Sequence, residues 1–186
     1  MHAMAEKDEN KIINTVRNWV EAVVINLNLC PFAKKVHLQN GIRFTVSKAL
    51  SEEELLLHLH DELVHISENP SIKTTLLIHP FVLEDFLAFN QFLAYADDLV
   101  EEMNLTGVFQ IASFHPAYQF ADTEQDDVEN YTNRSPYPVL HILSEEDIEQ
   151  AIATYPNIDE VPFRNKEKMR DLGPKKMKAL LQDCLR

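Results

Sequence analysis

Short apolar runs alternate with longer amphipathic runs through the first 115 residues, and this alternation limits the fold more than any other feature. The apolar runs IRFTV, TTLLIH and VFQIASFH are rich in β-branched and aromatic side chains, as buried strands are; they span residues 42–46, 74–79 and 108–115. Strands that alternate with helices favour parallel pairing through right-handed crossovers. The pattern therefore predicts an α/β domain, with an α+β domain as the alternative.

The other expected elements follow from helical spacing, caps and breakers. Ser51 and Glu54 form a capping box before one amphipathic run, and Pro80 is expected to open the next helix. The remaining elements are predicted helices at residues 10–29, 51–69, 80–104 and 144–155, a fourth strand at 139–143, and a last helical region broken at 173–174. We expect a single layer domain with a mostly parallel or mixed four-stranded sheet covered by helices. The direction of the fourth strand stays open.

The length of 186 residues suits one domain, with a frayed lead-in at residues 1–9. The net charge of −13 is unevenly distributed, because residues 164–186 hold eight basic and three acidic side chains, a local charge of +5. Opposite charges attract this segment to the rest of the chain. We therefore predict that residues 164–186 form a basic helical tail packed on the domain.

Charge and hydropathy exclude several classes of partner. A strongly acidic chain opposes nucleic acid and anionic membrane surfaces, and no apolar run approaches the ~20 residues that span a bilayer. The N-terminal residues lack the apolar stretch of a secretory signal, and two cysteines in dissimilar contexts give no disulfide framework. We expect a cytoplasmic protein with reduced thiols and no nucleic-acid or membrane partner. The oligomeric state and any cofactor stay unknown.

The stretch from Ser113 to His141 holds the most chemically reactive groups for its length. Within it, residues 116–137 show no periodicity, and loops of that length in compact domains are usually functional or disordered. His141 lies inside the fourth strand, where alternation does not decide which face it occupies. The stretch is therefore the first place to look for a site.

Two strands end in the pair His-Pro, at His79 and His115. Proline keeps each preceding histidine extended, so both should lie at the carboxyl ends of parallel strands, where open α/β sheets bind ligands. A helix beginning at Pro80 would place unpaired N–H groups near His79 and favour an anion there. The alternative is that each histidine finishes its strand and hydrogen-bonds a neighbouring carbonyl.

Arg134 lies between Asn133 and Ser135 on a proline-stiffened segment, which suits a carboxylate or phosphate ligand. Tyr118 and Asp122 are further ligand-binding candidates on the same loop. The competing interpretation is that Arg134 pairs with an acidic side chain of the loop and fastens it to the domain.

Cys30 precedes Pro31 at a predicted helix end and is most simply a buried structural cysteine. If Cys30, His79 and His115 converge, zinc or iron could bind them, although no CxxC or HxxxH pair is present. The metal site is therefore an alternative only.

Four blocks of sequence carry a family resemblance: CPFA at residues 30–33, the His-Pro pairs at 79 and 115, NRSPYP at 133–138 and RN at 164–165. With these blocks the chain resembles an uncharacterised bacterial family, domain-of-unknown-function family 1415. The resemblance spans nearly the whole chain. It implies a soluble single-domain bacterial protein and supplies no catalytic assignment.

The expected function is binding of an anionic small molecule, or an enzyme reaction, at the carboxyl rim of the sheet. His115 and His79 would act as acid or base, and Arg134 would hold the anion. The alternatives are a non-catalytic metal-binding protein that uses Cys30, His79 and His115, and a protein–protein interaction module. Whether the chain is an enzyme stays open.

Overall fold

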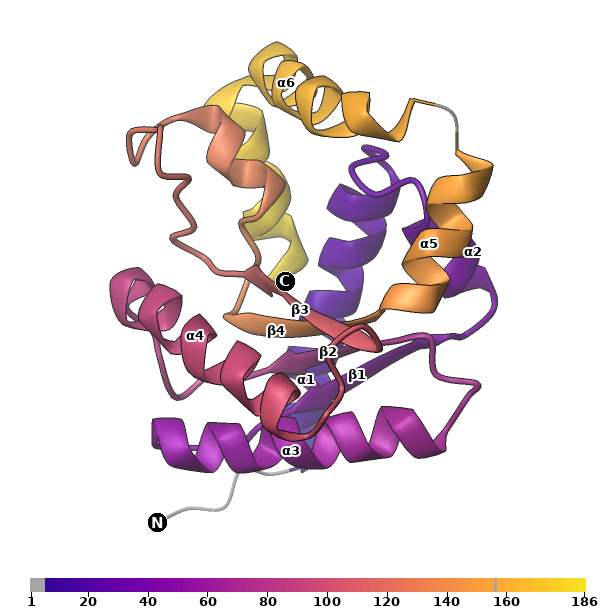
Figure 1. Ribbon diagram of the computed structural model, residues 1–186. Coiled ribbons are helices and arrows are strands. Elements are labelled where there is room, and N and C mark those ends of the chain that lie inside the picture. Colours follow the sequence, from indigo (N-terminus) through magenta and orange to yellow (C-terminus); the bar gives the residue numbers. More distant parts are fainter. Residues whose placement is uncertain (1–5, 156) are drawn as a thin grey trace.

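A mixed four-stranded sheet forms the centre of the molecule, with helices on both of its faces (Figure 1). The structure is a computed structural model that describes residues 6–155 and 157–186. Its strands are β1 (Ile42–Val46), β2 (Thr74–Ile78), β3 (Phe109–Phe114) and β4 (Val139–Ser144). They lie in the order β1-β2-β4-β3, so the α/β fold with a mixed sheet is confirmed.

The direction of β4, which sequence alone left open, explains the mixed character of the sheet. β1 pairs parallel with β2, and β4 pairs antiparallel with both β2 and β3. The first three strands therefore point the same way, as predicted, and β4 lies between two of them in the opposite direction. Phe114 and Val139 are paired residues, so the loop between β3 and β4 begins and ends at one edge of the sheet.

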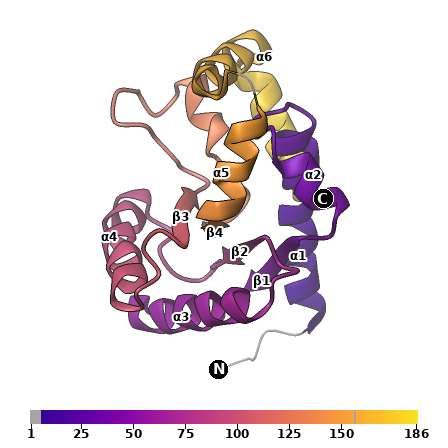
Figure 2. The ribbon, with the colours of Figure 1, turned by 45° about the vertical axis from the view of Figure 1, so that its right-hand side comes forward.

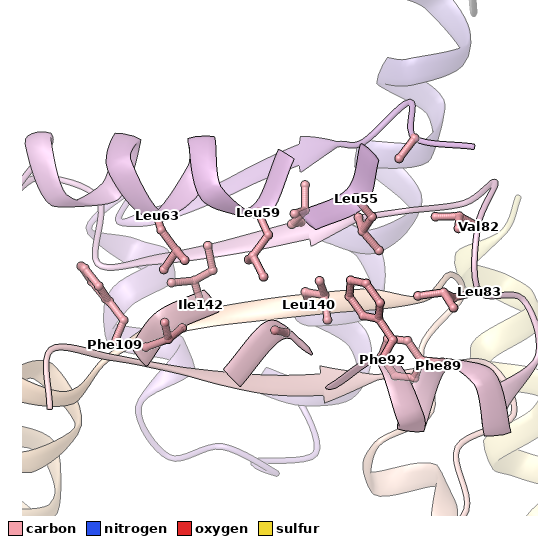
Figure 3. Packing of buried hydrophobic residues seen from close by; sticks show 14 of the residues in the cluster. Leu55, Leu59, Leu63, Val82, Leu83, Phe89, Phe92, Phe109, Leu140 and Ile142 are labelled. Atoms are coloured by element: carbon pink, nitrogen blue, oxygen red, sulfur yellow. The ribbon is translucent and has the colours of Figure 1, made fainter. Parts of the chain in front are cut away.

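Helices α3 (Glu52–Glu68) and α4 (Phe86–Glu102) cover one face of the sheet. The side chains of Leu55, Leu59 and Leu63 point from α3 towards Leu140 and Ile142 of β4, as Figure 3 shows. These residues have no solvent exposure, so this face is a fully packed hydrophobic core.

The opposite face carries α1 (Glu6–Trp19), its continuation η1 (Val20–Ile25) and α6 (Val161–Cys184). η1 is a π-helical segment, a wider turn that is frequent at functional sites. Val16, Trp19 and Val23 pack with Leu76 of β2 in this second core. The predicted helix at residues 10–29 is thus present, but it begins earlier and changes its winding near the sheet.

Side-chain caps begin two helices where the sequence predicts them. The Ser51 hydroxyl accepts a hydrogen bond from the Glu54 N–H at 3.2 Å, and Ser144 accepts one from the Asp147 N–H at 3.3 Å at the start of α5 (Glu145–Thr154). The short helix α2 (Ala33–Leu38) was not predicted, because six residues give too little periodicity. The remaining helical segments are η2 (Val128–Thr132) and η3 (Ile158–Glu160).

The predicted helix start at Pro80 is wrong. α4 begins at Phe86, where the Asp85 side chain accepts a hydrogen bond from the Ala88 N–H at 2.9 Å. Residues 80–85 instead form a turn in which Leu83 has a φ of 59°, outside the helical region. The helix start, with its free N–H groups, therefore lies at Phe86 and not directly after His79.

The C-terminal helix α6 bends at Gly173, which has φ 75° and ψ 161°, as the Gly-Pro pair predicts. Met169, Met177 and Cys184 of α6 are buried, and α6 packs against η2 and α1. Of the predicted frayed lead-in, residues 6–9 are helical, while residues 1–5 lie outside the described part of the chain. Among the helices of residues 6–155 and 157–186, none combines the length and the hydrophobicity that crossing a membrane requires.

Candidate functional site

The two strand-ending histidines lie together, yet neither is accessible. His79 is 0% exposed and His115 is 1% exposed. Both rings stack on Phe89 of α4, with ring centroids 5.5 Å and 5.1 Å from the Phe89 centroid. We call this pair the rim histidines. The rim where they lie is filled by aromatic side chains.

Backbone groups take most of the hydrogen-bonding capacity of the rim histidines. His115 Nε2 donates to the Leu83 carbonyl at 3.2 Å, and its Nδ1 accepts from the Ala117 N–H at 3.0 Å. His79 Nδ1 donates to the Val82 carbonyl at 3.1 Å, and Nε2 is a buried atom with no partner in the described chain. The two rings therefore hold the turn between β2 and α4.

Burial also sets the charge of the rim histidines. It lowers the pKa of His79 to about 4, with a smaller contribution from neighbouring His115, and it lowers the pKa of His115. Both rings are neutral near pH 7 as a result.

Arg134 fastens the loop between β3 and β4 through backbone carbonyls. Its Nε donates to the Tyr118 carbonyl at 3.1 Å, its Nη2 donates to the Gln125 carbonyl at 2.6 Å, and the guanidinium lies 4.8 Å from the centre of the Tyr131 ring. Ser135 is 1% exposed and donates to the Tyr137 carbonyl at 2.5 Å. These contacts favour the internal role for Arg134, with carbonyls in place of the acids that we considered.

Asn130, which the sequence did not single out, organises the same loop. It is 0% exposed. Its Oδ1 accepts from the Phe120 N–H at 3.1 Å and from the Thr123 hydroxyl at 2.7 Å, and its Nδ2 donates to the Glu124 carbonyl at 2.8 Å. One buried amide thus satisfies three groups of a segment that lacks regular structure.

The three predicted metal ligands are not brought together. His79 and His115 lie against Phe89, whereas Cys30 lines cavities next to η1. Within residues 6–155 and 157–186, no group of three or more His, Cys, Asp or Glu side chains could hold a metal ion. The Cys30, His79 and His115 set therefore does not form a metal centre in this structure.

A largely apolar cavity of about 330 Å³ lies on the α1 face of the sheet, enclosed by η1, α2 and α5, and we call it the inner cavity. Its volume falls within the range of ligand sites. The residues around it are Trp19, Val20, Val24, Cys30, Phe32, Ala33, Val36, Ile42, Lys73, Thr74, Leu76, Ala112, Phe114, His141, Leu143, Ser144, Asp147, Ile148 and Ala151.

His141 of β4 supplies the inner cavity with a hydrogen-bonding group. Its Nε2 lies 2.6 Å from the Thr74 hydroxyl oxygen, and that hydroxyl donates its proton to the Ile142 carbonyl at 2.7 Å. With the single hydroxyl proton given to Ile142, we assign Nε2 as the donor and Nδ1 as the nitrogen that carries the lone pair. Burial lowers the pKa of His141 to about 4, so this tautomer is the neutral one near pH 7.

His141 differs from the rim histidines in what surrounds its second nitrogen. The side chain lies deep in the protein but stays partly exposed, because the ring borders the inner cavity. Among the described residues, its hydrogen bond to Thr74 is the one contact of this kind that the ring makes. Nδ1 therefore has no hydrogen-bond partner among the described residues, on a ring that borders the cavity.

Trp19 adds a second unsatisfied group to the wall of the inner cavity. The side chain is 1% exposed, and its Nε1 finds no acceptor in the described part of the chain. Its ring meets Phe114 edge-on at 5.0 Å between centroids, and Phe114 lies 5.8 Å from the His141 ring. One phenyl ring thus separates an unpaired donor from an unpaired acceptor.

Helix α5 closes one side of the inner cavity and is held at both ends. At its start Asp147 lies 3.5 Å from Lys73, and just after its end the Tyr155 ring meets Phe32 edge-on at 5.9 Å. Figures 1 and 2 show α5 beside α2, above the end of β4. None of its residues is fully buried, so a weakly packed helix forms this wall.

A second, more polar pocket of about 590 Å³ adjoins the inner cavity, and we call it the outer pocket. The two share Val24, Cys30 and Phe114 in their walls. The outer pocket is lined by Val24, Leu29, Cys30, Phe114, Phe120, Ala121, Asp122, Thr123, Glu129, Thr132, Asn133, Pro162, Asn165 and Lys166. Of the predicted ligand-binding residues, Asn133 and Asp122 lie here, whereas Arg134, Ser135 and Tyr118 do not line it.

Three sequence blocks that are distant along the chain meet at the outer pocket. Cys30 comes from CPFA, Asn133 from NRSPYP and Asn165 from the RN pair. The Asn165 Nδ2 donates to the Leu29 carbonyl at 2.7 Å, which ties α6 to the segment before Cys30. The outer pocket therefore brings together three of the blocks that carry the resemblance, whereas the His-Pro pairs lie elsewhere.

Sequence reasoning missed the inner cavity because its polar centre depends on strand register. His141 and Thr74 belong to β4 and β2, and nothing in either run marks them as partners before the antiparallel pairing is known. A histidine flanked by apolar residues in a strand was the available signal, and alternation alone did not decide its face.

Comparison with protein families gives one match. The model of the family described as "Protein of unknown function (DUF1415)" matches residues 11–179. No curated protein and no solved structure matches the chain.

Proposed function

We infer from the geometry that this chain, which belongs to the family of proteins of unknown function DUF1415, binds a small molecule in the inner cavity. The ligand has a mainly apolar body and one hydrogen-bond donor, such as a hydroxyl or an amide N–H. The inner cavity replaces the carboxyl rim as the proposed ligand site.

The observation that carries the proposal is the contact of His141 Nε2 with Thr74 beside an apolar cavity, which assigns the lone pair of the ring to Nδ1. A donor on the ligand satisfies this acceptor in surroundings of low polarity, where a hydrogen bond contributes about 0.5–1.5 kcal/mol. Apolar lining supplies affinity, and a few polar groups supply orientation, as in most small-molecule sites.

The chemistry of His141 supports binding more than acid–base catalysis. A pKa of about 4 makes the imidazole a weak base near neutral pH, far from the value that proton transfer favours. The rim histidines, with Arg134, have a structural role in this proposal: they hold the turn after β2 and the loop after β3.

Two isomeric probes test the donor requirement. 1-Octanol and 1-methoxyheptane have the same atoms, but the ether has no donor. Trp19 is the single tryptophan of the chain and lines the cavity, so its fluorescence reports binding directly. We expect saturable binding of 1-octanol and roughly tenfold weaker binding of the ether. Equal affinities would contradict the role of His141.

Variants locate the site. His141→Phe keeps a planar ring without an acceptor, and it should remove the preference for the alcohol. Ala151→Leu fills the cavity from α5 and should abolish binding. Ala153→Leu makes the same change at an exposed position of α5 and is the matched control. Binding that survives Ala151→Leu would place the ligand elsewhere and refute the proposal.

A further inference from the structure

We propose that the ligand extends past Cys30 into the outer pocket and ends there in a carboxylate held by Lys166. The substrate class is then an elongated amphipathic carboxylate with a hydrogen-bond donor at its far end. This inference rests on the proposed function, because the donor end lies against His141.

The shared wall gives the first step. Val24, Cys30 and Phe114 line both the inner cavity and the outer pocket, so the two spaces are neighbours with these side chains between them. Cys30 is partly exposed, and the carbonyl of its neighbour Leu29 accepts a hydrogen bond from Asn165 of α6. Residues near both ends of the chain thus hold this shared wall in place. In this proposal an elongated molecule passes from the inner cavity to the outer pocket by displacing these side chains.

The two spaces differ in polarity, which gives the ligand its two ends. Apolar side chains dominate the inner cavity, whereas the outer pocket presents the side-chain amides of Asn133 and Asn165, hydroxyls and charged groups. Each amide donates from Nδ2 to a backbone carbonyl: Asn133 to Ser113 at 3.3 Å and Asn165 to Leu29 at 2.7 Å. A polar head therefore has ordered partners in the outer pocket and an apolar chain does not.

The arrangement around Glu129 makes Lys166 the group for an anion. Arg170 contacts Glu129 Oε1 through both Nε, at 2.7 Å, and Nη2, so this arginine already balances the Glu129 charge. Lys166 lies 3.5 Å from Glu129 Oε2, a looser contact. Its ammonium can turn to a ligand carboxylate while Glu129 keeps its arginine partner.

The other carboxylate in the lining, Asp122, lies at an exposed position. Solvent screens its repulsion of a ligand anion. Lys166 also lies 5.9 Å from the centre of the Phe120 ring, on the same loop. The Lys166 ammonium thus lies in the pocket lining beside an aromatic ring, which suits the methylene groups of the ligand next to its carboxylate.

Matched probes and matched variants test the carboxylate. 8-Hydroxyoctanoate adds a carboxylate to the end of 1-octanol that lies opposite the hydroxyl. We expect it to bind about tenfold more tightly than 1-octanol, as one charge-assisted contact gives. Lys166→Gln should remove this advantage and leave 1-octanol unaffected. Lys168→Gln removes the same charge from an exposed position of α6 that does not line the pocket, and should change neither.

Thiol labelling tests the path. With Cys184→Ser, Cys30 is the single remaining thiol. Saturating 8-hydroxyoctanoate should slow labelling of Cys30 by 5,5′-dithiobis(2-nitrobenzoate) about tenfold or more, because a bound chain covers the sulfur. Labelling at an unchanged rate would overturn the inference.

The outcomes separate the two proposals. If 1-octanol does not bind, or binds equally to the Ala151→Leu variant, the inner cavity is not the site and the proposed function fails. If 1-octanol behaves as expected but 8-hydroxyoctanoate binds no more tightly, or keeps its advantage in Lys166→Gln, this inference alone fails.

Discussion

His115 and His141 share a lowered pKa, yet their surroundings make them different kinds of residue. His115 gives both nitrogens to the backbone and stacks on Phe89. His141 binds one threonine and borders a cavity with its other nitrogen. A perturbed pKa in a buried histidine therefore does not mark a binding site by itself. His115 and His141 differ in the contacts of their second nitrogen, whereas His79, whose Nε2 has no partner in the described chain, differs from His141 in being fully buried.

The comparison extends to the two faces of the sheet. The α3/α4 face is packed around Leu59, Phe89 and Ile142, all with 0% exposure. The α1 face has the inner cavity between its helices and the strands. A protein interior is normally close-packed, and the inner cavity departs from that packing on the α1 face.

Lowering the pH should cause the largest change in the free energy of unfolding, and it tests the lowered pKa that His79 and His141 have in common. His79 and His141 each have a pKa of about 4 in the folded protein, against about 6.5 in an unfolded chain. The unfolded state thus binds more protons between these values, so stability is lost as pH falls from about 6.5 to 4, by up to about 3 kcal/mol for each residue. Urea unfolding at about pH 7.5 and 4.5 measures the loss.

The variant His141→Phe separates the contribution of His141 to this pH-dependent loss of stability from the contribution of His79. It should lose less stability than the unmodified chain over the same pH interval, because the His79 share remains and the His141 share is gone. Identical pH dependences in the two proteins would show that His141 does not titrate with a lowered pKa.

Truncation of one histidine of each kind should distinguish them most directly. His115→Ala removes partners from the Leu83 carbonyl and the Ala117 N–H in a sealed site, and should cost about 3 kcal/mol. His141→Ala enlarges an existing cavity and leaves the Thr74 hydroxyl bonded to Ile142, so about 1 kcal/mol is expected. Chemical denaturation compares the two. A larger loss for His141→Ala would reverse the assignment of roles.

Added methylenes should have opposite effects on the two faces. Ala96 is 0% exposed in the α3/α4 core, so Ala96→Leu overpacks it and should cost about 2 kcal/mol. Ala151→Leu places similar atoms in the inner cavity and should stabilise the fold by about 1 kcal/mol. Thermal unfolding of both variants tests this. Destabilisation by Ala151→Leu would mean that the cavity cannot accept a side chain.

The contact between Asp147 and Lys73 should have the smallest effect on stability and a larger one on access. Both side chains are partly exposed, so Asp147→Asn should change the free energy of unfolding by less than about 0.5 kcal/mol. Loosening the start of α5 should nevertheless increase acrylamide quenching of Trp19, which the rim variants should leave unchanged. Unchanged quenching in Asp147→Asn would show that this contact does not control access.

The elements that were predictable from sequence are those determined by neighbouring residues. Ser51 and Ser144 cap helices, Gly173 bends α6, and the strand at residues 42–46 matches β1 in both bounds. The start of α4 was wrong, because proline is tolerated in a first turn but does not require one, and Asp85 provides the stronger cap. Local chemistry decides caps and breaks, whereas competition between two candidate caps needs the tertiary structure.

The candidate site was predictable only in part. The residues Cys30, Asn133 and Asp122 were singled out and do line one pocket. The centre of the inner cavity was not found, since His141 and Thr74 become neighbours only through the pairing of β2 with β4. Arg134 was expected to face a ligand, but carbonyls of its own loop bind the guanidinium. The register between distant strands and the conformation of a long loop depend on tertiary structure, so local sequence does not predict them.

The position of β4 also determines the order in which this sheet can form. β4 is the last strand of the chain but lies between β2 and β3, so residues 139–144 must be present before those two strands share a sheet. A nascent chain that ends before residue 139 leaves unpaired the two strand edges, one on β2 and one on β3, that β4 covers in the complete sheet, and unpaired edges are prone to intermolecular pairing. We therefore expect the sheet to form only after β4 has been synthesised, slowly and cooperatively, because β4 joins the β1-β2 pair to β3.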